Sequence, residues 1–222
     1  TKNMEKIKIF QVDAFSNNLF SGNPAAVCLI DNWLPDEVMQ SIALENNLSE
    51  TAFVIKKKNK FFIRWFTPKV EIDLCGHATL ASAHIIYSEM NYKSDYIEFN
   101  IQSGDVLSVN RKNNLLNMNF PAYKPEIVDQ SLDDLYDAFG VRPTLFLYCK
   151  YGLAVFNNEE EIIKIIPKLN VIKKLPYDGI IITAPGENVD FVSRFFAPKF
   201  GIREDPVTGG AHCELIPYWS KR

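Results

Sequence analysis

Two short segments, far apart in the chain, carry the residue types that proton-transfer chemistry needs. Residues 73–79 read Asp-Leu-Cys-Gly-His-Ala-Thr, and residues 204–212 read Glu-Asp-Pro-Val-Thr-Gly-Gly-Ala-His. Each combines an acid, a thiol or hydroxyl, a glycine turn and a histidine just before a run that predicts a helix. Because a helix N-terminus offers free backbone N–H groups and the positive end of the helix dipole, it holds anions well. Two such ends facing each other are expected in an enzyme that moves a proton on a small carboxylic acid.

The elements that must position these segments follow from the hydrophobic pattern. Strands are expected at residues 7–15, 25–30, 51–55, 61–66, 96–101, 106–110, 115–120, 145–149, 153–156, 179–183 and 191–196. Helices are expected at residues 35–47, 76–90, 131–139, 159–166 and 209–219. The second and the last of these helices start at the two glycine turns, and residues 131–134 resemble a capping box.

The order of these elements predicts the α+β class. Clear βαβ alternation is missing, and no glycine-rich dinucleotide loop follows the first strand, so we expect mostly antiparallel sheets in two similar lobes. The stretch from Pro121 to Pro125 is bracketed by prolines and predicts the linker between an N-terminal lobe (residues 1–121) and a C-terminal lobe (residues 122–222). The similarity of residues 73–79 to residues 205–212 hints at an internal repeat.

Composition excludes several classes of function. The 222 residues are 47% hydrophobic, enough to bury a core, and the net charge of -3 comes without a basic stripe, which argues against a nucleic-acid surface. The densest basic run, residues 56–58, predicts a solvated turn. No apolar run reaches the length of a membrane span and the N-terminus lacks a signal-peptide stretch, so we expect a cytoplasmic, reducing setting with no membrane partner.

Cysteines and histidines give no metal or disulfide pattern. Cysteine pairs spaced as CxxC are absent from the sequence, and the histidines lack ligand spacing, because His84 follows His77 by two helical turns. We therefore expect no disulfide framework and no metal. The aromatic group Phe195, Phe196 and Phe200 predicts core packing.

Four ordered signatures resemble those of one family. They are residues 17–27 (NNLFSGNPAAV), 47–53 (NLSETAF), 64–68 (RWFTP) with 73–79 (DLCGHAT), and 203–209 (REDPVTG). The chain is similar to the PhzF family, the phenazine-biosynthesis-like isomerases. This resemblance implies the fold of diaminopimelate epimerase, in which two related lobes each wrap a curled sheet around a central helix, with the site in the cleft between them. It further implies an isomerase or epimerase that uses no cofactor and is usually a homodimer.

The resemblance also implies site roles. Glu50 matches the general acid/base, His77 the histidine at the first helix entrance, and Asp205 the aspartate at the second. The turns whose backbone N–H groups contact substrate match Gly76, Gly209 and Gly210.

The residues themselves support part of this assignment. Apolar neighbours of Glu50 are compatible with burial, which would raise its pKa from about 4.3 towards roughly 6–7, so that it could take and return a proton. A helix N-terminus disfavours the imidazolium of His77. Asp205 either caps the following helix or faces the substrate, or does both. Cys75 is either a thiol activated at a helix start or an inert buried cysteine, and Asn23 either presents its amide to the substrate or serves a turn.

Three departures from the family pattern matter. Gly210 stands where the phenazine enzyme has a serine, so one hydroxyl contact is lost. Related epimerases use two cysteines as opposed bases, whereas here Cys75 occupies the first place and Thr208 the second. Family members usually continue for some tens of residues beyond the last signature, so the chain ending at Arg222 is either a short gene product or a truncated sequence.

The leading expectation is therefore a cofactor-independent isomerase that acts on a small carboxylic-acid metabolite by general acid/base catalysis. Two alternatives stay open. One is an amino-acid epimerase or racemase on the same fold. The other is a non-catalytic dimeric binding protein that has kept the fold.

Overall fold

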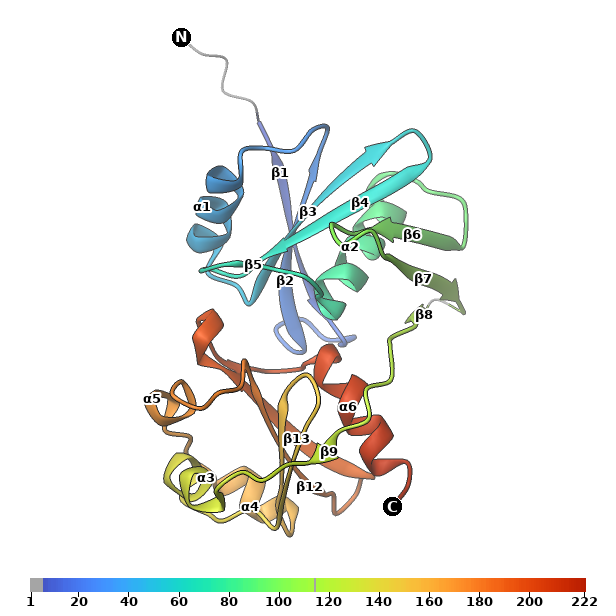
Figure 1. The fold of residues 1–222 in the computed structure, drawn as a ribbon. Helices are drawn as coiled ribbons and strands as arrows, with labels where there is room; N and C mark the ends of the chain where they lie inside the picture. Colours follow the sequence, from blue (N-terminus) through green and yellow to red (C-terminus); the bar gives the residue numbers. More distant parts are fainter. Residues whose placement is uncertain (1–5, 114) are drawn as a thin grey trace. The chain divides into compact units, whose positions relative to one another are not determined.

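The computed structural model describes residues 6–113 and 115–222, and the chain forms two compact units, Thr1–Asn119 and Phe120–Arg222 (Figure 1). Each unit is built on its own sheet, with eight described strands in the first and six in the second. None of the described helices is long and apolar enough to cross a membrane.

The sheet of the first unit has the order β1-β2-β3-β4-β6-β7-β8, with β5 beside β4. Its strands are β1 (Lys8–Ala14), β2 (Asn23–Ile30), β3 (Glu50–Lys57), β4 (Lys60–Phe66), β5 (Glu71–Ile72), β6 (Tyr96–Asn100), β7 (Val106–Lys112) and β8 (Leu115–Met118). The β2–β3 and β4–β6 pairings are parallel, and the remaining pairings are antiparallel. The antiparallel meander predicted from residues 96 to 120 is thus confirmed.

Two helices, α1 (Asp36–Asn46) and α2 (Gly76–Glu89), cover opposite faces of this sheet. Successive side chains of a strand point to opposite faces. Accordingly, Ala52 and Val54 of β3 pack in the core cluster that contains α2, whereas Phe53 packs with Met39 and Ala43 of α1. The continuous apolar run of β3 is therefore buried on both sides.

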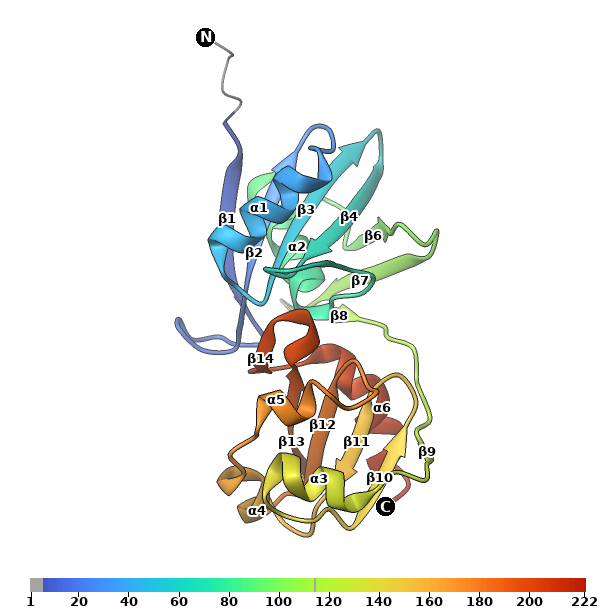
Figure 2. The ribbon, with the colours of Figure 1, turned by 60° about the vertical axis from the view of Figure 1, so that its left-hand side comes forward.

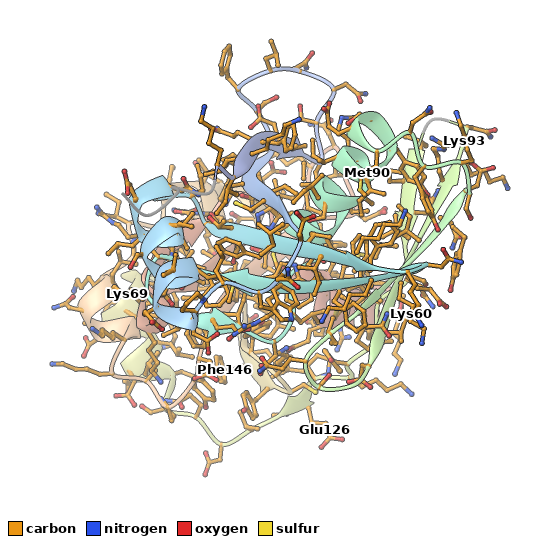
Figure 3. All side chains as sticks on the ribbon, turned by 90° about the horizontal axis from the view of Figure 1, so that it is seen from above. Lys60, Lys69, Met90, Lys93, Glu126 and Phe146 are labelled. Carbon is orange, nitrogen blue, oxygen red and sulfur yellow. The ribbon has the colours of Figure 1, made fainter. Side chains whose placement is uncertain are left out.

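The basic run of residues 56–58 is exposed, as predicted. Lys56 and Lys57 end β3, however, and only Lys58 of the run lies in the turn to β4. Figure 3 labels Lys60 at the start of β4, and Met90 and Lys93 just beyond the end of α2, and all three residues are exposed.

The sheet of the second unit has the order β14-β13-β12-β11-β10-β9. Its strands are β9 (Glu126–Ile127), β10 (Leu145–Tyr148), β11 (Gly152–Val155), β12 (Ile180–Pro185), β13 (Phe191–Ala197) and β14 (Ile202–Asp205). Only β11 and β12 pair in parallel. The helices are α3 (Leu132–Phe139), α4 (Glu159–Lys164), α5 (Leu169–Ile172) and α6 (Gly209–Trp219), with a short 3₁₀ turn η1 (Pro198–Phe200) (Figure 2).

This second sheet is also covered on both faces. Ile180 and Ile182 of β12 pack in a cluster that includes residues of α3, α4 and α5, whereas Ile181 packs in the cluster of α6. Phe195 and Phe196 are both buried, on opposite faces, which confirms their predicted core role. The two units together have the expected α+β class with mostly antiparallel pairing.

The structure differs from the sequence prediction at short elements. Strands β5, β9 and β14 and helix α5 have two to four residues each, too few for a periodic pattern to reveal them. The predicted capping box is wrong, because Ser131 makes no side-chain cap hydrogen bond. The third helical position holds Asp134 rather than a glutamate, and its carboxylate accepts from Gln130 Nε2 instead.

Candidate active site

Two strand starts and one helix start bring four predicted site residues together in the first unit. Asn23 opens β2 and Glu50 opens β3. These strands pair in parallel, with Ala25 opposite Glu50, so both begin at the same edge of the sheet. Helix α2 begins at Gly76 after Cys75, whose backbone is extended (φ -141°, ψ 116°), and this places His77 in the first turn.

His77 is the centre of this cluster. Its Nε2 atom lies 3.2 Å from Oε2 of Glu50. On the other edge of the ring, Nδ1 lies 3.5 Å from both Sγ of Cys75 and Nδ2 of Asn23. All four side chains are buried, with Asn23 0% and Glu50 5% exposed. The imidazole therefore contacts a carboxylate on one side and a thiol and an amide on the other, away from bulk water.

Burial keeps His77 neutral. It lowers the pKa of His77 from 6.5 to about 4, against a smaller opposing effect from a hydrogen bond with the backbone of Pro24. The sequence predicted a neutral ring from the helix N-terminus, and the direction is confirmed, but the larger cause is loss of solvent. A neutral imidazole has one donor and one acceptor nitrogen, so it can pass a proton to or from Glu50.

The N-cap residue and the first turn of α2 carry no side chain that caps the helix or neutralises its dipole. Cys75 at the N-cap position makes no side-chain cap hydrogen bond, and the first turn has no acidic residue. By contrast, the first turns of α1, α3 and α4 all carry acids. The positive dipole end of α2 is thus not neutralised by its own first turn, which favours an incoming anion.

The second predicted segment forms a similar helix entrance in the second unit. Asp205 ends β14 and is buried, and its Oδ2 accepts a hydrogen bond of 2.6 Å from Oγ1 of Thr208. Thr208 is the N-cap residue of α6, yet its hydroxyl donates to Asp205 and makes no cap hydrogen bond. Gly209 and Gly210 form the first turn, again without an acid. In both α2 and α6, therefore, the side chain of the N-cap residue makes no cap hydrogen bond.

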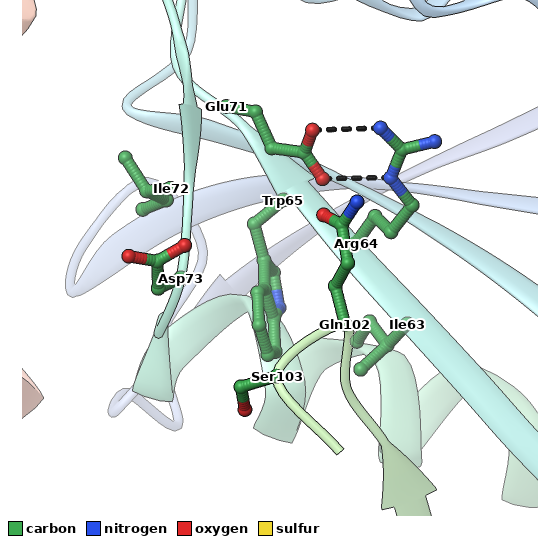
Figure 4. Close-up of a pocket in the computed structure, with 8 residues that line it drawn as sticks. All are labelled: Ile63, Arg64, Trp65, Glu71, Ile72, Asp73, Gln102 and Ser103. Atoms are coloured by element: carbon green, nitrogen blue, oxygen red, sulfur yellow. Dashed lines mark hydrogen bonds and ion pairs between the residues drawn. The ribbon is translucent and has the colours of Figure 1, made fainter. Parts of the chain in front are cut away.

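The apparent repeat does not extend to every residue. Asp73 is exposed, unlike Asp205, and lines a small cavity with Trp65, Gln102 and the Arg64–Glu71 ion pair, as Figure 4 shows. His212 is exposed as well, and its Nδ1 lies 2.8 Å from the carbonyl oxygen of Thr208. Asp73 and His212 thus lie outside the groups of buried side chains around His77 and Asp205.

Glu50, Cys75 and His77 also offer three donor atoms within 4.8 Å of one another. A carboxylate, a thiolate and an imidazole are donors that zinc accepts. However, Glu50 and Cys75 approach different nitrogens of the ring, so an ion bound between all three would require the imidazole to turn. The sequence spacing did not indicate this cluster, because Glu50 comes from another strand, and the expectation of no metal stays a prediction.

One buried acid was not predicted. Glu214 in α6 is 0% exposed, and its Oε1 accepts hydrogen bonds from the backbone N–H groups of Lys150 (3.0 Å) and Tyr151 (2.8 Å). Desolvation raises the pKa of this carboxyl, and the two N–H donors oppose that rise. The available signal was a single acid inside the otherwise apolar stretch from Ala211 to Trp219.

The family model of phenazine biosynthesis-like proteins (PhzC-PhzF) matches residues 12–222 of the chain. The chain belongs to this family. A PhzF relative named an uncharacterized isomerase, from Pseudomonas aeruginosa, is 48% identical over 218 residues, which are 98% of this chain and 83% of that protein. The family and the enzyme class predicted from the four signatures are thereby confirmed.

Solved structures agree with this family assignment. The PhzF-family protein of Enterococcus faecalis has a TM-score of 0.90 at 45% identity and covers 97% of this chain and 83% of its own. A hydroxyproline epimerase of Agrobacterium vitis has a TM-score of 0.64 at 9% identity, over 97% of this chain and 77% of its own. The second likeness shows that the PhzF fold is shared with an epimerase, and it concerns the fold alone.

Proposed function

We propose that this PhzF-family chain is an isomerase that moves a proton on a small carboxylic acid without a cofactor, with Glu50 as the proton shuttle. The observation that carries the proposal is the buried contact of 3.2 Å between Glu50 and a neutral His77 in the first turn of α2. The isomerase names of relatives support the class of reaction.

Each residue of the first unit has a role in this proposal. Glu50 removes a weakly acidic C–H proton beside the substrate carboxylate and returns a proton elsewhere on the molecule. His77 stays neutral and orients the Glu50 carboxylate through its Nε2 contact, while Cys75 and Asn23 fix the other edge of its ring. The N–H groups at Gly76 bind the negative charge that develops. Positioned acid–base catalysis contributes roughly 10²–10⁴ in rate, and fixed N–H donors contribute the larger share.

The resemblance assigns residues of the second unit to the same reaction. Asp205 is assigned a catalytic role, as its hydrogen bond from Thr208 fixes one carboxylate oxygen and the burial excludes water. The N–H groups at Gly209 and Gly210 are assigned to the substrate carboxylate. Thr208 offers a hydroxyl where a two-thiol epimerase needs an ionisable thiol, which favours the isomerase over that epimerase. The homodimer that the resemblance implies remains part of the proposal.

Replacing Glu50 by glutamine tests this function. The amide keeps the size of the side chain but cannot take up a proton at neutral pH. Small carboxylic acids, both unsaturated acids and amino acids, would be incubated with the protein in deuterated water, and deuterium incorporation and double-bond position followed by NMR. We expect E50Q to lower the rate by about 10²–10⁴ with little change in melting temperature.

The matched control is Glu45→Gln, which changes an exposed acid of the same unit. It should leave the rate unchanged. Undiminished turnover by E50Q would show that Glu50 is not the base. Deuterium exchange confined to the α-carbon of free amino acids would instead favour the epimerase.

A further inference from the structure

Three side chains that can bind a metal ion meet at the start of α2, although one of them comes from a distant strand. Glu50, Cys75 and His77 each offer one donor atom within 4.8 Å of the other two. A tetrahedral zinc ion, with bonds of about 2.0–2.3 Å, needs ligand atoms roughly 3.3–3.8 Å apart. Sγ of Cys75 already lies 3.5 Å from Nδ1 of His77. Only the carboxylate must approach more closely, which a turn of the imidazole towards both donors allows.

The donor types select a soft divalent cation. Thiolate and imidazole ligands suit zinc, whereas magnesium and calcium prefer oxygen ligands. A carboxylate and a thiolate together neutralise a divalent ion. This matters here because Glu50, Cys75 and His77 are each at most 5% exposed, and an uncompensated charge is costly to bury. Three protein ligands leave one tetrahedral position open for water or for the carboxylate of a small molecule.

The position of Cys75 also suits a metal-bound thiolate. Cys75 is the N-cap residue of α2 and makes no side-chain cap hydrogen bond. The positive end of the helix dipole opposes a cation, but it favours the thiolate that binds the cation. On binding, a bond forms between the metal and Sγ, and the thiol proton is released to the solvent.

We propose that Glu50, Cys75 and His77 form an inhibitory site for zinc and similar thiophilic divalent cations. The ion occupies the carboxylate that serves as the base, so zinc and substrate exclude each other. The inhibition rests on the proposed function, whereas the binding of the ion does not. Because the ion takes no part in the reaction, the proposed isomerase still needs no cofactor. The expectation of no metal considered only spacing along the sequence, in which Glu50 is remote from the other two ligands.

Cobalt binding tests the site without any measurement of turnover. Co²⁺ occupies zinc sites and gives a near-ultraviolet absorption band when a thiolate binds it. It would be titrated into reduced, untagged wild-type protein, Cys75→Ser and Cys149→Ser. Cys149 is the matched control, since it is an exposed thiol in the second unit. We expect the band at one equivalent of Co²⁺ in the wild-type protein and in C149S, its absence in C75S, and its loss when zinc displaces cobalt. An equal band in C75S would overturn the proposal.

The other two ligands are tested by affinity. Loss of an outer partner of a metal ligand typically costs 10–100-fold in affinity, so loss of a direct ligand should raise the Kd of Co²⁺ by at least about 100-fold. We expect this for His77→Gln and for Glu50→Gln. His84→Gln changes an exposed histidine on the same helix and should leave the Kd unchanged. A Kd that H77Q leaves at the wild-type value would refute the site.

X-ray absorption of zinc-bound C149S keeps the test decisive even if the ligand variants fail to fold. We expect one sulfur at about 2.3 Å and nitrogen or oxygen ligands at about 2.0–2.1 Å. A shell without sulfur would contradict the assignment. Zinc should also raise the apparent KM of the isomerase and leave kcat unchanged, and unaffected turnover with the site filled would refute the inhibition. Absence of the cobalt band would overturn the metal site alone. Normal turnover in E50Q would instead overturn the proposed function and leave the metal site standing.

Discussion

The buried histidine makes a prediction that needs no knowledge of the substrate. In the folded chain the pKa of His77 is about 4, compared with 6.5 for an ordinary histidine. Between these two values the unfolded chain binds a proton at this position and the folded chain does not. Stability from His77 is therefore fully present above pH 6.5 and is lost as the pH falls towards 4.

The size of this effect follows from the pKa shift. At about 1.4 kcal/mol for each unit of pKa, the difference between 6.5 and about 4 corresponds to about 3.5 kcal/mol. An ionised Glu50, 3.2 Å from Nε2, would attract the charged ring and reduce the effect, so this figure is an upper value. Replacing His77 by glutamine removes the titrating group and should flatten the pH dependence of stability across this window.

The assay is urea unfolding of wild-type protein, His77→Gln and the exposed-site control His212→Gln at several pH values between 4 and 7.5. All three proteins carry Trp219→Phe, so that the fluorescence of the remaining Trp33 and Trp65 reports on the first unit. We expect H212Q to show the same dependence of unfolding free energy on pH as the wild-type protein. In H77Q the fall in unfolding free energy from pH 7.5 to 4 should be smaller by up to about 3 kcal/mol. Equal slopes in all three proteins, or an NMR titration that places the His77 ring near pH 6.5, would refute the reasoning.

Two further substitutions test one contact in each unit. Thr208→Val removes the hydroxyl that donates to buried Asp205, and it should lower the free energy of unfolding by about 1–2 kcal/mol and also lower turnover. Thr208→Ser should restore both the stability and the turnover. Normal turnover in T208V would contradict the role given to Asp205. Arg64→Lys replaces two donors to Glu71 and one to Asp36 by a single ammonium group, and should cost about 1–2 kcal/mol. Removing the exposed Lys164–Glu160 pair should cost less than about 0.5 kcal/mol, and an equal loss there would contradict the argument for Arg64.

Long elements and contiguous motifs could be predicted from the sequence, since their signals are local. Helices α2 and α6 begin at the expected glycine turns, and the burial of β3 follows from its apolar run. Neutral His77 could be predicted from its place in a helix start. The main cause of its neutrality could not be predicted, because the burial of His77 is produced by strands that are distant in sequence.

Contacts between segments that are distant in the sequence could not be predicted from the sequence pattern. Nothing in the spacing of Glu214 and Tyr151 indicates that one accepts the backbone N–H of the other, as 62 residues separate them. The similar segments around Asp73 and Asp205 suggested equivalent acids, yet one is exposed and the other buried. A shared motif fixes the backbone turn, and the surrounding sheet decides what each side chain touches.

The composition of α2 limits how this protein can acquire new substrates. Its buried residues are mostly glycine, alanine, serine and threonine, so the strands approach the helix axis closely and leave no room for larger side chains. Libraries that vary Ala78 or Ala83 should yield mainly insoluble protein. Variation at partly exposed positions such as Tyr151 and Gly210 tolerates change better, and laboratory evolution of altered selectivity should begin there.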